Sequence, residues 1–515
     1  MKKSIQILTG DNVCRTGEVV RAGDEISPCG ITLQVSNLRD EEQQTTTSRQ
    51  PGQKIATKTI LNGDIIILGG FEVGRATADI CSGAHVHMHN MEPIRRDDEY
   101  RFGHEIPDPL SPLTGTLKGY VRENGGVGFR NFIGITTSVN CGNHTAGRIA
   151  AALQKKVEDD LGSYPNIDGV LSFRQATGCG IKTGGMLFKN IQRTLAGYRR
   201  HPGFGKVLNV SLGCETFQPK LIQLAGMNEP QQNVDFVTIQ QKGGVQKTID
   251  YAVDLLAEQL PDINNVSRVD VPTSHILAGL QCGGSDGNSA TTANPAVGVF
   301  SDTVVRHGGG ACLSETTEAW DVEQDLLRRA KEDVGRKFLE RMNWWKRYME
   351  FFDCSPEANP SHGNRVRGIT TDAEKSVGAI LKGGTTELKA VYEYAEAIGR
   401  GFSFMDTPGY DPMACTGLIG GGANVIIFTT GNGSCYGSIP APTIKIVTTT
   451  QIYEHMIDDM DINAGVIMDG TRTIEEVGAQ IFDHACRVLS GEKTKSEKQG
   501  IGQEEFNIWI PGGIL

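Results

Sequence analysis

The stretch Ile276-Leu277-Ala278-Gly279-Leu280-Gln281-Cys282-Gly283-Gly284-Ser285-Asp286 decides how the second half of the chain folds. Its apolar beginning predicts a buried strand, and its Gly-rich end predicts a tight turn at the strand's carboxyl end. Open parallel α/β sheets bind ligands at this edge. Short polar side chains then follow with little bulk. We therefore predict the floor of a site for a small, oxygen-rich molecule, with these binding residues: Gly283, Gly284, Ser285, Thr292 and Asn294.

The same alternation of strand, loop and helix extends in both directions from this stretch. It predicts a multidomain α/β protein with mainly parallel sheets in residues 116–265 and 266–515. Short strands between Gly- and Asp-containing turns predict a small β-rich domain in residues 1–92. Residues 93–115 are charged, contain several prolines and predict a linker. A helical apolar stripe predicts one long helix over about 317–352.

Composition narrows the class of protein. A length of 515 residues is too great for one core, and 22% charged with 38% apolar residues is typical of a soluble protein. A net charge of -11 without Lys/Arg blocks argues against nucleic acid or a membrane as partner. We find no signal peptide or membrane-length run, and twelve cysteines without a CxxC pair predict reduced thiols in the cytoplasm. The expected partner is a small molecule, and a homo-oligomer is compatible with the sequence.

Four cysteines share a position just past the end of a predicted buried strand: Cys141, Cys179, Cys214 and Cys282. Because loops of this kind meet at one edge of a parallel sheet, they predict a convergent metal site. Thiolates favour iron, zinc or an iron–sulfur cluster. The alternative is that each cysteine is a small apolar residue at a tight turn.

A histidine-rich run, Ala84-His85-Val86-His87-Met88-His89-Asn90, ends the first domain. If the run is a strand, alternation places His85, His87 and His89 on one face, where they could bind a metal. The alternative is an edge strand with a polar outer face. Five cations near the predicted loops could bind a substrate carboxylate. They are Arg130, Lys182, Arg306, Lys375 and Lys445.

Several of these segments together resemble the altronate/galactarate dehydratase family, in order and over nearly the whole chain. The segments are Asp11-Asn12-Val13, the histidine run, Val127–Asn131, Gly178-Cys179-Gly180, Leu212–Glu215, Gln281–Asp286, Thr292–Pro295 and Met460–Gly465. The resemblance implies an antifreeze-like (SAF) β domain followed by two α/β regions. It also implies Fe(II)-dependent removal of water from a sugar acid, giving a 2-keto-3-deoxy acid; Mn(II) or an iron–sulfur cluster could replace Fe(II). The histidine run is nearer the altronate branch.

Such a dehydration needs positive charge for the developing enediolate and groups that transfer protons. We predict four catalytic candidates: Glu215, Asp286, Glu315 and Lys445. Arg130, Asn131 and Asn364 are further candidates for substrate binding.

The chain departs from the family pattern at three positions. Gln53 and Gln175 stand where histidine is expected, and Asn432 stands where arginine is expected. Glutamine cannot act as a base, and the loss of an arginine removes a carboxylate-binding group. Two alternatives to the dehydratase therefore stay open: a related β-elimination lyase, such as a sulfolactate sulfo-lyase, and a non-catalytic sugar-acid-binding protein.

Overall fold

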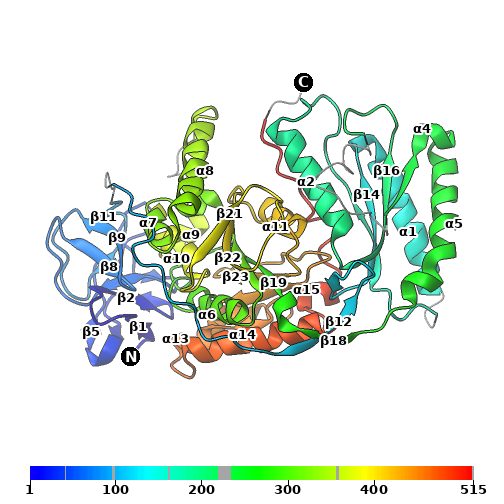
Figure 1. Ribbon diagram of the computed structural model, residues 1–515. Coiled ribbons are helices and arrows are strands. Elements are labelled where there is room, and N and C mark those ends of the chain that lie inside the picture. The colour runs from blue at the N-terminus through cyan, green and yellow to red at the C-terminus, as the bar shows by residue number, and fades with distance from the viewer. Residues whose placement is uncertain (41, 95–98, 160–162, 219–233, 355–358, 513–515) are drawn as a thin grey trace.

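The computed structural model describes residues 1–40, 42–94, 99–159, 163–218, 234–354 and 359–512. The N-terminal domain is built from short, mainly antiparallel strands (Figure 1). Two of its sheets have the orders β1-β2-β7-β10 and β11-β9-β8. Its strands are β1 (Ser4–Ile5), β2 (Val13–Thr16), β3 (Val20–Arg21), β4 (Glu25–Ile26), β5 (Leu33–Gln34), β6 (Ser48–Arg49), β7 (Lys54–Ala56), β8 (Ile65–Leu68), β9 (Phe71–Ala76), β10 (His85–Val86) and β11 (Met91–Glu92).

The next unit contains a four-stranded parallel sheet in the order β15-β14-β16-β17. The strands are β14 (Phe132–Thr137), β15 (Gly169–Phe173), β16 (Phe204–Ser211) and β17 (Val234–Thr238). Helices α1 (Asn143–Asp159) and α5 (Val245–Asn264) bury an apolar cluster against this sheet. Helix α2 (Met186–Arg200) packs against α11 (Asp411–Gly420) of the following unit. Helix α4 (Ile239–Lys242) precedes α5.

The C-terminal unit surrounds a seven-stranded parallel sheet in the order β21-β22-β20-β19-β23-β24-β25. The strands are β19 (Leu277–Cys282), β20 (Gly310–Leu313), β21 (Leu388–Tyr392), β22 (Gly401–Met405), β23 (Val425–Thr430), β24 (Thr443–Val447) and β25 (Ile462–Asn463). Most central strand residues are buried, as expected for a parallel sheet covered on both faces. The observed architecture confirms the predicted fold class: a β-rich N-terminal domain followed by α/β units with parallel sheets.

The strand order of this sheet reverses at its centre. From β19 the chain builds outward through β20, and it later returns to place β23 on the other side of β19. This is a topological switch point, where the carboxyl ends of an open sheet leave a crevice for a ligand. Besides α11, the helices of the C-terminal unit are α6 (Ala293–Arg306), α7 (Glu323–Leu327), α8 (Glu332–Glu350), α9 (His362–Val366), α10 (Asp372–Leu381), α12 (Thr450–His455), α13 (Gly465–Met468), α14 (Ile474–Leu489) and α15 (Lys495–Lys498).

Two features of the α/β part were not predicted. A small antiparallel sheet, β13-β12-β18, joins the units through β12 (Thr116–Val121), β13 (Val127–Gly128) and β18 (Val269–Pro272). The single helix predicted over about 317–352 is wrong. Asp321 takes a left-handed conformation (φ 60°) that interrupts the predicted helix before α7, and Lys331, with a non-helical ψ of 154°, separates α7 from α8. The apolar stripe is nevertheless buried at Leu326, Phe338 and Met342.

The N-terminal domain docks on α10 through a buried ionic contact. Lys54 Nζ lies 2.8 Å from Glu374 Oε2, and Arg15 pairs with the same carboxylate. Arg15 and Lys54 also donate to the carbonyl of Gly368, each at 3.0 Å. No helix within the described ranges is both long and apolar enough to cross a membrane.

Candidate active site

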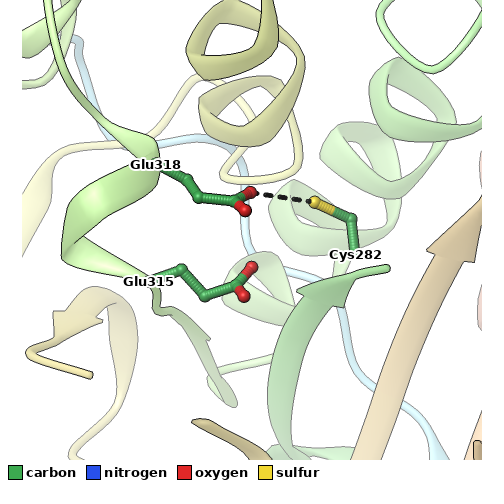
Figure 2. Close-up of side chains that lie close together, drawn as sticks. All are labelled: Cys282, Glu315 and Glu318. Atoms are coloured by element: carbon green, nitrogen blue, oxygen red, sulfur yellow. Dashed lines mark hydrogen bonds between the residues drawn. The ribbon is translucent and has the colours of Figure 1, made fainter. Parts of the chain in front are cut away.

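Three acidic side chains converge at the switch point of the large sheet (Figure 2). The Cys282 thiol and the carboxylates of Glu315 and Glu318 are buried, and one ligand atom from each lies within 4.8 Å of the others. Cys282 Sγ is 3.7 Å from Glu318 Oε2. Such a cluster can bind a divalent cation, because thiolate and carboxylate are both metal ligands.

The two loops that follow β19 and β20 deliver these groups. Cys282 is the last residue of β19, and Glu315 follows β20 in a left-handed conformation (φ 70°). A single 3₁₀ turn, Thr316–Glu318, then brings Glu318 back to the same space. The Glu315 backbone N–H donates to Thr407 Oγ1 (2.9 Å), which fixes the entry to this turn.

Two lysines on one face of α10 cover the acidic cluster. Lys382 Nζ is 2.7 Å from Cys282 Sγ, and Lys375 Nζ is 2.5 Å from Glu318 Oε1. Lys375 also donates to Asn359 Oδ1 at 2.8 Å. The two lysines are seven residues apart, which is about two helical turns and places them on the same face.

Burial and neighbouring charges shift the pKa values of Cys282, Glu315 and Glu318 in different directions. Burial raises the pKa of Cys282 to about 12, although Lys382 opposes the shift. Burial and the neighbouring Glu318 raise the pKa of Glu315 well above its usual value. Burial alone would raise the pKa of Glu318, but Lys375, Lys382 and the hydrogen bond from Asn359 together outweigh it and lower that pKa. These shifts favour the anionic form of Glu318 and the protonated form of Glu315.

A cavity of about 460 Å³ opens in front of the cluster. Asp411, at the start of α11, faces it; burial raises the pKa of Asp411 to about 6, although its hydrogen bond from Gln281 (2.9 Å) opposes the shift. A Cβ at Gly283 would lie 2.3 Å from Asp411 Oδ2, so glycine is needed for this close approach. The lining comprises Cys282, Gly283, Gly284, Glu315, Thr317, Glu318, Trp320, Met349, Cys354, Asn359, Ser361, Asn364, Lys375, Gly409, Tyr410 and Asp411.

Of the four predicted catalytic residues, Glu315 lies in this cavity and the others lie outside its described lining. Asp286 is buried and accepts from Ser289 Oγ and Thr448 Oγ1, each at 3.0 Å. Lys445 donates to the carbonyl of Ser434 (3.0 Å). Glu215 lies in the preceding unit, where it accepts from Ser138 Oγ at 2.7 Å.

The predicted substrate-binding residues also divide. Gly283, Gly284 and Asn364 line the cavity. Ser285, Thr292 and Asn294 are buried and lie outside the described lining. The Ser285 carbonyl accepts a hydrogen bond from Asn364 Nδ2 (2.6 Å). Thr292 Oγ1 donates to the Thr448 carbonyl (3.0 Å), and Asn294 Nδ2 donates to the Gly378 carbonyl (2.8 Å).

Arg130 and Asn131 lie between β13 and β14, where their side chains bind other parts of the protein. Arg130 pairs with Glu497 (2.6 Å), and the Asn131 amide donates to the carbonyls of Asn166 and Ile263 at 2.7 and 3.0 Å. Among the five predicted carboxylate-binding cations, Lys375 is the one that the described cavity lining includes.

The four predicted metal-binding cysteines do not form one site. Cys141, Cys179 and Cys214 follow β14, β15 and β16 of the smaller sheet, whereas Cys282 ends β19 of the larger one. The sequence shows strands but not which sheet each strand joins, and the prediction merged two sheet edges. In the described part of the chain, Cys282 with Glu315 and Glu318 is the one group of ligand atoms within 4.8 Å of one another.

The histidine run is a strand only at His85 and Val86, so the condition for strand alternation over the whole run is not met. Strand β10 ends at Val86, and a turn closes from His87 to Asn90, with the His87 N–H donating to Asn90 Oδ1 (3.0 Å). The rings of His87 and His89 lie on His85, with centroids 5.2 and 5.9 Å away. His85 Nε2 is 3.0 Å from Gln53 Oε1, and its Nδ1 accepts from the Arg39 N–H (3.3 Å). Both nitrogens of His85 are therefore engaged in protein hydrogen bonds.

The three side chains that depart from the family pattern each donate a hydrogen bond to a backbone carbonyl. Gln53 donates to the carbonyl of Val366 next to α9 (3.1 Å), and Gln175 donates to the carbonyl of Ser138 (2.6 Å). Asn432 donates to the carbonyl of Gly284 at 2.9 Å. Each side chain supports a loop, and all three stand outside the described cavity lining.

Sequence reasoning did not select Glu318, Lys382 or Asp411 as site residues. Asp411 could have been found, because it directly follows a predicted strand end. Lys382 could have been paired with Lys375, because the two are seven residues apart and such a spacing places them on one face of a helix. Glu318 depends on a 3₁₀ turn that lay within the segment predicted as helix.

Known protein families and relatives match nearly the whole length of the chain. Family models match the altronate/galactarate dehydratase SAF domain at residues 2–93, the D-galactarate dehydratase/altronate hydrolase second domain at 119–264, and the D-galactarate/altronate dehydratase C-terminal domain at 273–513. An altronate dehydratase of Bacillus subtilis (strain 168) is 33% identical over 100% of both chains. A galactarate dehydratase (L-threo-forming) of Escherichia coli (strain K12) is 37% identical over 80% of each chain. An altronate dehydratase of the same strain is 32% identical over 92% of this chain and 94% of its own.

The chain combines an SAF domain with two parallel α/β units, and the family models and relatives that it matches are those of dehydratases, which places it in the class of multidomain hydro-lyases. The matches cover each of these parts in order. The chain belongs to the altronate/galactarate dehydratase family.

Proposed function

We propose that this protein dehydrates a sugar acid of the altronate or galactarate type to a 2-keto-3-deoxy acid, with Fe(II) bound in the Cys282 cavity. The observation that carries the proposal is the convergence of Cys282, Glu315 and Glu318 at the switch point of a sheet in a chain of this family. A cavity of about 460 Å³ is within the range that encloses small ligands.

The charges of the cluster support a bound cation. Cys282, Glu315 and Glu318 offer up to three negative charges, and Lys375 and Lys382 offset two of them. Burial, and after it the neighbouring Glu318, raises the pKa of Glu315, so both effects disfavour its anion when no cation is bound. Cys282, Glu315 and Glu318 would hold a divalent cation, which would supply positive charge to stabilise negative charge on substrate oxygens. A thiolate beside carboxylates is compatible with iron.

The substrate carboxylate has a natural position beside Lys375. This ammonium lines the cavity together with the amides of Asn359 and Asn364. The turn at Gly283 and Gly284 lies in the same lining and brings backbone close to the ligand without side-chain bulk. We assign these groups to binding and orienting the carboxylate end of the sugar acid.

Asp411 is the proton-transfer group that the geometry favours. It faces the cavity, and the Gln281 amide fixes one of its carboxylate oxygens. A base with a pKa of about 6 is ionised at neutral pH and is close to the optimum for proton transfer. Removal of the proton at C2 by Asp411, with loss of the hydroxyl at C3, gives an enol that rearranges to the 2-keto-3-deoxy acid.

A substrate screen tests this proposal. Protein purified without oxygen is supplied with Fe(II) and a reductant, and 2-keto acid is measured with altronate, galactarate, other C5 and C6 aldonates and aldarates, and sulfolactate. We expect turnover of one sugar acid, loss of turnover on chelation and recovery with Fe(II). Turnover of sulfolactate alone would show a different leaving group. If protein that has bound the metal forms no 2-keto acid from any of these acids, the result would contradict a catalytic role.

A further inference from the structure

Of the four cysteines predicted as metal ligands, the three that lie outside the active site occupy one edge of the smaller sheet. Cys141, Cys179 and Cys214 follow β14, β15 and β16, which are adjacent parallel strands with β14 in the centre. All three thiols are exposed, whereas Cys14, Cys312 and Cys415 are buried. Packing, which accounts for a buried cysteine, does not account for three exposed thiols at one sheet edge.

Hydrogen bonds join the three cysteine-bearing loops into one layer above the end of β14. The N–H of Asn140 donates to the carbonyl of Thr177 (2.8 Å), which connects the loops after β14 and β15. The N–H of Phe217 donates to the carbonyl of Gly178 (3.0 Å), which connects the loops after β15 and β16. Ser138 Oγ donates to Glu215 Oε1 (2.7 Å) and closes the third side.

Gly178, beside Cys179, lets the loops after β14 and β15 approach at backbone contact distance. Gly178 has a φ of +116°, and a Cβ there would lie 2.5 Å from the carbonyl oxygen of Ser138. Gly213 has a φ of +127°, and a Cβ there would lie 2.5 Å from Gln240 Oε1. A side chain at Gly178 would push the loops after β14 and β15 apart, whereas Gly213 is required by its positive φ and by the neighbouring Gln240 of α4.

We propose that Cys141, Cys179 and Cys214 bind an iron–sulfur cluster through three thiolates and leave one iron without a cysteine ligand. A single iron or zinc ion holds thiolates at about 2.3 Å, which limits the distance between two sulfurs to about 4.6 Å. In the described chain, these thiols do not form a group of three within 4.8 Å. A cluster fits a wider spacing, because each cysteine binds a different iron atom.

The number of thiols also decides between cluster types and other uses. An odd set of three free thiols cannot be satisfied by one disulfide. A cluster of four irons bound by three cysteines has one iron open to an oxygen ligand, either water or a hydroxyl or carboxylate of a small acid. The proposal does not depend on the dehydratase assignment, because this site lies on a different sheet from the Cys282 cavity.

Reconstitution of the full-length protein tests the proposal. After anaerobic incubation with Fe(II), sulfide and a reductant, and removal of unbound material, we expect visible sulfide-to-iron absorption and about four irons and four acid-labile sulfides per chain in the cluster. Loss of one electron to a mild oxidant should release the open iron as Fe(II) and produce the paramagnetic signal of a three-iron cluster, and added Fe(II) together with a reductant should reverse this.

Variants locate the cluster. Cys141→Ala, Cys179→Ala and Cys214→Ala should each abolish the visible absorption and the bound sulfide, with circular dichroism showing that the protein stays folded. Cys81→Ala, an exposed cysteine of the N-terminal domain, is the matched control and should keep both. Cys282→Ala should keep the cluster too, which separates this site from the cavity. Bound metal without labile sulfide, or equal signals in all five variants, would overturn the proposal.

Discussion

Replacing Asp411 with asparagine is expected to lower kcat by a factor of about 10²–10⁴ and to change KM little. Asparagine keeps the shape of the side chain and can still accept the hydrogen bond from Gln281, but it cannot take a proton. In the wild-type enzyme, kcat/KM should fall as the pH drops through about 6, because burial raises the pKa of Asp411 to that value and protonation removes the base. The variant should lose this pH dependence.

Asp406→Asn is the matched control for this prediction. Asp406 is also a buried aspartate near a strand end, but it accepts from Trp345 Nε1 (2.8 Å) and Thr316 Oγ1 (2.6 Å) and lies outside the described cavity lining. Its replacement should lower the melting temperature while kcat keeps the wild-type pH profile. Full activity of Asp411→Asn would exclude Asp411 as the base.

The second large effect is on stability. Glu374→Gln is expected to lower the free energy of unfolding by about 3–5 kcal/mol, because it removes the anion shared by two buried cations. Arg15 and Lys54 are fully buried beside Glu374, and burial lowers the pKa of Arg15 to about 9 and that of Lys54 well below its usual value. Without the carboxylate, the N-terminal domain loses its ionic attachment to α10.

Urea unfolding monitored by fluorescence and by limited proteolysis of the N-terminal domain measures this effect. Glu332→Gln serves as the control, since Glu332 forms an exposed ion pair with Arg336 on the surface of α8, and its loss should cost no more than about 0.5 kcal/mol. If the two variants unfold at the same urea concentration, the buried contact does not hold the domains together.

The fold was largely predictable because its signals are local. The apolar run before Cys282 and the glycines after it specify a strand and a turn, and both form as expected. Glu315 was found in the same way, just past the next strand of the sheet.

What could not be predicted depends on contacts between segments that are distant in the sequence. The grouping of Cys282 with the other three thiols failed because strand order and sheet membership are not encoded locally. The role of Lys382 requires α10 to lie over β19, which is 100 residues away along the chain. The histidine run was misread because Asn90 closes a turn that ends its strand early. Glu318 was missed because a 3₁₀ turn, Thr316–Glu318, forms where the sequence has helical periodicity.

The most direct test of the central claim is an anomalous difference map at the iron absorption edge, from crystals grown without oxygen with Fe(II) and the sugar acid that turns over. We predict an iron peak in contact with Cys282 Sγ, Glu315 and Glu318, and a substrate carboxylate beside Lys375. Crystals that hold the sugar acid elsewhere, with no iron between these three side chains, would contradict the assignment of this cavity as the active site.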